Sequence, residues 1–545
     1  MKTRYKLLTI CCSMLAVMLC SCQDFLTESS KSSLTTDNFY QKPADMDQAL
    51  TGVYGTLKPL PTYYFIMSES RSDNMFQILV SKQNEYADCA HFNTTGLLND
   101  NIVNNCWSDL FSVVAAANAY LDNIDNVTFQ SDEIKEQYEG EGRFLRALAY
   151  FDLVRFFGRV PVTTHVLSTS ESFSLSQSEA IDIYNEVIVP DLQRAVETLH
   201  DTPIDYNGSA RSTGTGHVTL AAAKGLLGKV YMQMAGYPLY QDTKSKAQQL
   251  FKEVLDYASA NNKYWVSSMS DWNKMWIHEN DNKYFMFEIQ YVAEANQGNP
   301  ATPLCRPSTT SKDEYCNAYL TAGQHVYVER DLQEHFFANS TTEQGEDTTI
   351  VYDERFKGTI NSYGSYDEET GTYSSSSGNN IMVKFFEHKM KRADLGYSDM
   401  DAEIVDRRYW PQNWPILRIE DIALLYAECV GNTTEGYYYL NKIRNRAGLT
   451  SLQNVTPDEF QEAVKQERRY ELLGEGHRWF DEVRQNTFVN DCKTKFINYR
   501  DNRDSAHSDN YTIYANRVTQ NMALYPIPLA QIQVREGLYE QNPGY

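Results

Sequence analysis

Apolar side chains recur at helical spacing through much of the chain. In the segment EGRFLRALAYFDLVRFFG, residues 141–158, they return every three or four positions from Phe144 to Val154. This spacing places them along one face of an α-helix. Gly158 closes the pattern and Pro161 follows it, so the helix is predicted to end at Gly158.

A second helix is predicted over residues 176–199. Ser176 and Glu179 have the spacing of a capping box ahead of its apolar positions. Pro190 lies inside the pattern and has no backbone N–H, so we expect a kink there. Two more helical pairs follow the same order: 219–237 with 245–261, and 419–430 with 435–447.

In all three pairs, a first helix rich in Ala and Tyr precedes a more amphipathic one. Tetratricopeptide-like hairpins let small and bulky residues interlock in this order. The spacing between the pairs is irregular, which indicates degenerate repeats with insertions. The predicted fold is therefore mainly α, a scaffold of tetratricopeptide-like helical hairpins.

Between residues 262 and 416 the pattern changes. The segments 282–292 (NKYFMFEIQYV) and 381–388 (IMVKFFEH) have the composition of short strands, and 361–380 is a polar excursion rich in Gly and Ser. Long irregular segments on a rigid scaffold often carry binding sites. We therefore expect a loop-rich insertion that contains short strands and contributes a ligand face.

The first 21 residues have the form of an export signal, with basic MKTRYK followed by an apolar run too short to span a membrane. Leu19-Cys20-Ser21-Cys22 resembles the lipobox of bacterial lipoproteins, in which the last cysteine is acylated, with palmitate among the chains. Two or three acyl chains make a durable anchor. The alternative is a plain secretory signal. The predicted organisation is a signal peptide (1–21), a flexible lipidated leader (22–35), an N-terminal helical region (36–261), the insertion (262–416) and a C-terminal helical region (417–545).

The surface is acidic. The net charge is -23, and it becomes -26 without the three cations of the signal, so binding to nucleic acid or anionic lipid is not expected. The 38 tyrosines suit both helix packing and the binding of amphipathic ligands such as sugars. The cysteines after the signal form no CxxC pair, which argues against a zinc or redox site. Cys305 and Cys316 are left open as a disulfide or as free thiols.

The stretch KQERRYELLGEGHRWFDEVR, residues 465–484, has the residue types of an acid/base active site. Thr456, Pro457 and Glu459 predict a helix start ahead of it, which places Glu467 and Glu471 on the face that should be buried. Buried carboxylates need partners, and neighbouring arginines would keep them ionised. The structural interpretation is preferred over catalysis. The predicted ion-pair network comprises Arg444, Arg446, Glu467, Arg468, Glu471 and Arg478.

Other catalytic patterns are missing from the sequence. It contains no GxSxG, P-loop, GxGxxG after a strand, or HExxH, so several enzyme mechanisms are excluded. His477 has no second histidine at metal-ligand spacing. Glu279, Asp281 and Asn282 lack the spacing and glycine of an EF-hand loop, and calcium binding there stays open. No cofactor and no metal site is predicted.

The charged stretch resembles the signature of the SusD/RagB family, the nutrient-binding surface lipoproteins of Bacteroidetes. Five further motifs appear in the expected order: residues 22–26, 141–162, 417–430, 439–449 and the C-terminal YPIPLAQIQVREGLYEQNPGY. The resemblance covers nearly the whole chain. One departure is GHVTLAAAKGLLGKVYMQ, which opens without an arginine.

This resemblance implies a helical scaffold without catalysis, located at the outer membrane and docked on a TonB-dependent transporter of the SusC type. A variable face would capture an oligosaccharide or polysaccharide, and closure would deliver it to the transporter. In resembling proteins, ligand residues come from segments that here are 71–77, 91–100 and 291–323. The candidates are Arg71 and Asn74 for hydroxyl groups, and Phe92, Tyr291, Tyr315 and Tyr319 for stacking.

Two other functions compete with glycan capture. Some members of the family take up oligopeptides, and the ligand region does not distinguish a peptide from a sugar. A glycoside hydrolase needs two carboxylates roughly 5 to 10 Å apart, and a chain with 72 acidic residues meets that condition easily. The sequence does not identify the glycan.

Overall fold

The computed structural model describes residues 39–77, 85–211, 216–276, 283–292, 297–301, 326–329, 331–332, 335, 353–355, 359–367, 372–382, 412–502 and 508–545. The signal, Cys22 and the leader lie outside these residues. The same holds for the pair Cys305 and Cys316 and for the calcium candidates at 279–282. Those expectations therefore stay predictions.

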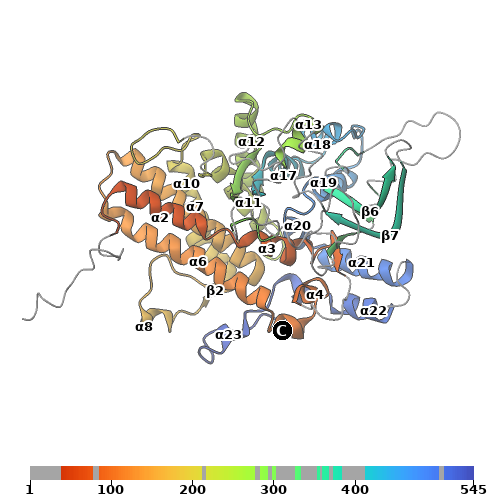
Figure 1. The fold of residues 1–545 in the computed structure, drawn as a ribbon, viewed down its shortest axis with the longest axis horizontal. Helices are drawn as coiled ribbons and strands as arrows, with labels where there is room; N and C mark the ends of the chain where they lie inside the picture. The colour runs from red at the N-terminus through yellow and green to blue at the C-terminus, as the bar shows by residue number, and fades with distance from the viewer. Residues whose placement is uncertain are drawn as a thin grey trace, which may run out of the picture.

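The described chain is mostly helical, as predicted. At one end of the molecule lie α2 (Pro43–Gly55), α6 (Asn101–Asn123), α7 (Asp132–Phe157) and α10 (Val189–Thr198), which pack on one another (Figure 1). Helix α7 includes the predicted 141–158 segment and ends where expected. Gly158 caps it with a φ of 72°, a conformation that residues with a side chain rarely adopt.

The helix predicted over 176–199 begins later, and its predicted capping box is wrong. Gln177–Ser178 forms strand β3, antiparallel to β2 (Val160–Pro161), so the backbone is still extended there. Glu179 is the N-cap of α9 (Ala180–Ile183) instead. A π-helical turn, η3 (Tyr184–Ile188), then leads into α10. This wider turn directly precedes Pro190, where the missing N–H was expected to disturb the helix.

The other two helical pairs form as predicted, and they pack on each other. They are α11 (Leu220–Ala235) with α12 (Lys244–Ala260), and α17 (Ile419–Val430) with α18 (Thr434–Arg446). Helix α12 contacts both α11 and α17, so the two pairs make one continuous layer in the middle of the molecule (Figure 1).

The insertion carries short strands, as predicted. Strand β4 (Phe285–Ile289) is antiparallel to β8 (Trp414–Arg418), and both are buried throughout. Within the polar excursion, β6 (Ile360–Asp367) pairs antiparallel with β7 (Thr372–Met382), so these residues form strands in a region expected to be rich in loops. It belongs to a sheet of order β1-β5-β7-β6, with β1 at Met75–Gln77 and β5 at Val326–Val328. Figure 1 shows β6 and β7 at the end of the molecule opposite α2 and α6.

The C-terminal region places the charged stretch inside the molecule. Thr456 caps α19 (Pro457–Glu471) in a capping box with Glu459, as predicted. Helices α20 (Arg478–Arg484), α21 (Phe488–Asn502) and α22 (Ser508–Arg517) follow, and their apolar faces join the same hydrophobic core as α7 and α11. Among the helices that the structure describes, none combines the length and apolar character needed to cross a bilayer.

Candidate functional site

The two glutamates of the charged stretch lie at the centre of an ion-pair network. Glu467 and Glu471 have no exposed surface. Arg355 donates from Nη1 to Glu467 Oε1 at 2.7 Å and to Glu471 Oε2 at 3.1 Å. Arg444 donates to Glu467 at 3.2 Å, and Arg446 pairs with Glu471. These carboxylates are closed to any substrate in this structure.

Two arginines at the centre of this network were missed by sequence reasoning. Arg355 comes from the insertion, and Arg418 comes from the end of β8. Arg418 is 1% exposed and donates to Glu420 at 2.9 Å, to Glu471 at 3.2 Å and to Glu475 at 2.8 Å. Both are far from α19 along the chain, so no local spacing could have indicated them.

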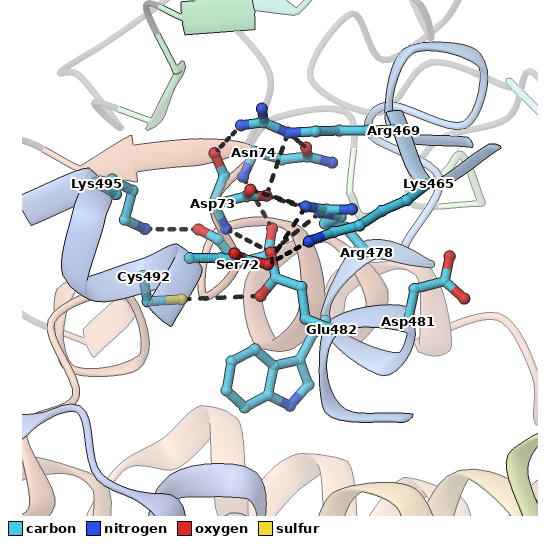
Figure 2. A network of polar contacts seen from close by, with 12 residues as sticks. Ser72, Asp73, Asn74, Lys465, Arg469, Arg478, Asp481, Glu482, Cys492 and Lys495 are labelled. Atoms are coloured by element: carbon cyan, nitrogen blue, oxygen red, sulfur yellow. Dashed lines mark hydrogen bonds and ion pairs between the residues drawn. The ribbon is translucent and has the colours of Figure 1, made fainter. Parts of the chain in front are cut away.

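A second part of the network joins α20 to the segment before β1 (Figure 2). Arg478 donates to both oxygens of Asp73, at 2.7 and 2.8 Å, and to Glu482 at 3.0 Å. Arg469 donates to the Asp73 carbonyl at 2.6 Å and to the Asn74 side chain at 3.0 Å. Two segments separated by about 400 residues are thereby fixed to each other.

The surroundings of Asp73 and Glu482 shift the pKa values of both carboxyl groups. Burial acts to raise the pKa of Asp73, but Arg469 and Arg478 lower it well below the usual value. Burial and the neighbouring Asp73 raise the pKa of Glu482 well above its usual value. The two adjacent carboxyl groups therefore differ in how readily they ionise.

Asp73 and Glu482, together with Asp491, also have the arrangement of a metal-binding cluster. Their carboxylate oxygens lie within 4.8 Å of one another. Positive charge is already supplied by the protein, because Arg478 binds Asp73 and Glu482, and Lys465 donates to Asp491 at 2.9 Å. A cation would compete with these side chains, so the donor set does not favour a metal.

Four of the six residues predicted to bind ligand are described, and all four are buried. The Arg71 guanidinium lies 4.3 Å from the centre of the Phe92 ring, and it donates to the Met522 carbonyl at 2.8 Å. Asn74 donates to Glu69 at 2.8 Å. Tyr291 donates to the Lys58 carbonyl at 2.6 Å and is 1% exposed. In this structure these side chains are packing residues, without an open face for a sugar.

The remaining two candidates, Tyr315 and Tyr319, lie outside the described residues. Their role in ligand binding stays a prediction. A cavity in a different part of the described chain is a better candidate for a ligand site.

A cavity of about 490 Å³ lies where three segments meet. They are residues 201–211 and 216–219 between α10 and α11, residues 262–271 between α12 and the start of α13 (Met269–Met275), and β4 with the two residues before it. The cavity is open to solvent, because its lining includes the exposed residues Asp201 and Lys283. This volume is in the range typical of small-molecule sites.

The cavity walls combine aromatic rings with polar groups. Tyr264, Trp265 and Tyr284 supply rings, and Arg211, His217 and Glu288 supply hydrogen-bonding groups. Such a combination suits a ligand with both apolar faces and hydroxyl groups.

The backbone shape of the cavity walls depends on residues with a positive φ. Gly216 has a φ of 69°, and a Cβ atom on it would lie 2.9 Å from the Gln290 side chain. Asn262 and Tyr264 have φ values of 49° and 67°. The left-handed region is unfavourable for a bulky residue such as tyrosine, and such residues are often found at functional sites.

Sequence reasoning located this cavity only in part. Residues 262–288 begin the insertion that was expected to contribute the ligand face, but none of the wall residues was singled out. The strain at Tyr264 and the meeting of three distant segments have no signal in a single sequence.

Comparison with known proteins gives consistent matches along the chain. The model described as "SusD family" matches residues 270–545, and the one described as "Starch-binding associating with outer membrane" matches residues 24–232. SusD-like protein P25 of Formosa agariphila is 24% identical over 567 residues, which cover 96% of this chain and 97% of that protein.

Solved structures have the same fold. The crystal structure of a SusD homolog from Bacteroides thetaiotaomicron matches with a TM-score of 0.75 at 21% identity, over 94% of this chain and 98% of that chain. A structure titled "Laminarin binding SusD-like protein" matches with a TM-score of 0.67 at 22% identity, over 93% of this chain and all of that chain.

Proposed function

This chain belongs to the SusD/RagB family, and from that premise we propose that it captures a glycan at the outer membrane and delivers it to a TonB-dependent transporter of the SusC type. The observation that carries the proposal is the family match over both halves of the chain, with the fold preserved over nearly its full length. A structural relative titled as binding laminarin supports a glycan as the ligand.

Capture without turnover is the expected mode of action. The most catalytic-looking stretch of the sequence is buried, and Glu467 and Glu471 are each held by two or more arginines. General acid catalysis needs a carboxyl group with a raised pKa next to substrate space. Arginines favour the ionised form, and burial excludes the substrate. These glutamates serve to stabilise the scaffold.

Attachment at Cys22 would keep the protein at the membrane while the leader lets it move. Delivery to the transporter then requires no membrane-spanning segment of this chain. The protein is expected to face the cell exterior, where polysaccharide is available. The description of the N-terminal family match supports the outer membrane as the location.

The capture proposal is tested with purified full-length protein in detergent and a panel of polysaccharides, neutral and acidic oligosaccharides, and short peptides. Affinity electrophoresis and calorimetry measure binding, and chromatography of the incubated ligands measures cleavage. We expect saturable binding of at least one glycan, with no product. Product formation that is lost in folded Glu467→Gln or Glu471→Gln would overturn the proposal. Binding of peptides alone would replace glycan capture by peptide capture.

The delivery step is tested separately in cells. Cys22→Ala should release the protein from the membrane fraction, and the wild-type protein should copurify with a TonB-dependent transporter. A wild-type protein that stays soluble and purifies without any transporter would contradict both anchoring and delivery.

A further inference from the structure

The cavity lined by residues 201–211, 216–219, 262–271 and β4 contains a histidine whose ring is bonded to a buried carboxylate. We propose that this cavity is a saccharide subsite, in which Nε2 of His217 forms a hydrogen bond with a sugar hydroxyl. The inference rests on the glycan-capture function proposed above. It locates a binding position away from the four-stranded sheet, because none of the described lining residues belongs to that sheet.

The directions of the surrounding hydrogen bonds can be worked out from their donors. The Val218 N–H donates to the Tyr54 hydroxyl at 3.0 Å, so the single proton of that hydroxyl is free to donate to Glu141 Oε2 at 2.5 Å. The Gln137 carbonyl oxygen accepts from the His200 N–H at 3.0 Å, so the amide nitrogen of Gln137 donates to Glu141 Oε1 at 3.0 Å. Both oxygens of Glu141 therefore act as acceptors.

Glu141 is thus an ionised carboxylate with no exposed surface. Burial acts to raise its pKa, but His217 and the donors beside it lower the pKa below its usual value. The Nδ1 atom of His217 lies 2.6 Å from Glu141 Oε2. Because the carboxylate accepts, Nδ1 carries a proton, and Nε2 is left for a ligand group that can both donate and accept, as a hydroxyl does.

The ring of His217 is positioned for contact with a ligand. Its side chain is 7% exposed, and it lines the cavity. Within the part of the chain that the structure describes, Glu141 is the hydrogen-bond partner of this ring, and it occupies Nδ1 only. The Tyr54 ring packs edge-on against it, with centroids 5.2 Å apart. The imidazole is therefore held in one orientation before any ligand arrives, which lowers the entropic cost of binding.

The rest of the cavity fits a neutral sugar. The charged side chains of the described lining are balanced, with Arg211, Lys263 and Lys283 against Asp201, Asp271 and Glu288, so the cavity does not select for a charged ligand. Asp271 already accepts from the Tyr284 hydroxyl at 2.6 Å. The rings of Tyr264 and Trp265 line the walls, where the C–H face of a pyranose can lie against them. A hydrogen-bonding imidazole next to aromatic walls matches the mixed character of a saccharide.

The backbone supports the same interpretation. Tyr264 is held at a φ of 67°, although the left-handed region is costly for this residue type. Asn262 in the same turn also has a positive φ. The backbone of Lys263 is fixed by its bond to the Ala258 carbonyl at 2.9 Å, and its side chain donates to Tyr257 at 2.8 Å. The strain is thus maintained by neighbouring contacts, and it fixes Tyr264 at the cavity wall.

The inference is tested by calorimetric titration of the full-length protein with whichever neutral oligosaccharide of the panel binds. His217→Ala is expected to raise Kd about tenfold, the effect of losing one well-placed hydrogen bond in a partly buried site. His165→Ala is the matched control, because His165 is an exposed histidine that does not line the cavity. It should leave Kd unchanged.

His217→Ala also removes a partner of buried Glu141 and so risks destabilising the fold. Tyr264→Gly avoids this, because glycine tolerates the positive φ while the ring is lost. We expect an unchanged melting temperature to within a few degrees and a similar rise in Kd. If both variants fold and bind the oligosaccharide as tightly as the wild type, the cavity is not the subsite, although glycan capture stands. If no glycan on the panel binds the wild type, the proposed function itself fails.

Discussion

The buried charges around α19 and the open cavity beside β4 use similar residues in opposite ways. Around Glu471, Arg355, Arg418 and Arg446 satisfy a carboxylate that has no exposed surface. In the cavity wall, Glu141 holds the His217 ring, and the ring lines a space of about 490 Å³. A charged or polar group becomes available to a ligand only when the protein leaves part of its hydrogen-bonding capacity unused.

This difference also explains why a charged motif is a poor guide to a binding site. The residues of the 465–484 stretch look reactive in the sequence, but they neutralise one another. In this network, a buried ion pair that loses one member leaves a charge without compensation. Such a network fixes distant segments in place, and this leaves recognition to other surfaces.

The largest effect is expected from Arg418→Met. The change leaves the carboxylates of Glu420, Glu471 and Glu475 without their shared partner, and removal of one member of a buried network costs about 3–5 kcal/mol. Urea unfolding followed by circular dichroism measures the loss. A decrease below about 1 kcal/mol would show that the network contributes no more than a surface ion pair does.

An effect of intermediate size is expected from acid at His477. Burial, followed by the nearby Lys229, lowers the pKa of His477 to about 3. Below a pH of about 6.5, His477 is protonated in the unfolded chain, whereas in the folded chain it stays neutral down to about pH 3. The free energy of unfolding should therefore decrease as the pH is lowered from about 6.5 to about 3. The decrease from this group is about 1.4 kcal/mol per pH unit.

His477→Gln should remove that contribution while keeping a polar side chain. The gap in stability between wild type and variant is expected to narrow as the pH falls from 6.5 to 4, measured by urea unfolding at each pH. A gap that stays constant over this range would mean that His477 is protonated in the folded protein.

The smallest effect is expected from Arg194→Ala. Arg194 is 33% exposed and pairs with Glu136 and Glu139 at the surface of the N-terminal helices. Exposed ion pairs contribute roughly 0–1 kcal/mol and are weakened by salt. The difference from wild type should be within this range and should shrink in 1 M NaCl. A loss as large as that of Arg418→Met would remove the distinction between surface and buried charges.

Much of the helical scaffold could be predicted from the sequence, since helix signals are local. The capping box at Thr456 and Glu459, the stop at Gly158 and the three helical pairs all depend on residues within a few positions of each other. The capping box predicted at Ser176 was wrong because the deciding contact is not local. Gln177–Ser178 pairs with a strand that precedes it by about 17 residues, and this pairing overrides the local capping signal.

The candidate ligand residues show the same limit. Arg71 and Asn74 lie in a polar segment that has the composition of a surface loop. The structure encloses Arg71 between the rings of Phe92, Trp479 and Tyr525, and it joins Asn74 to Arg469. These partners are distant in sequence, so composition could not show that the segment is buried.

By itself, the sequence determined that this protein is an α-helical member of its family, because helix periods, caps and family motifs are read over short stretches of chain. Only the tertiary structure decided which polar groups are paired with each other and which face open space. Glu141 illustrates the reason: its partners come from α2, from α7 and from the segment before α11, and only folding brings them within hydrogen-bond distance.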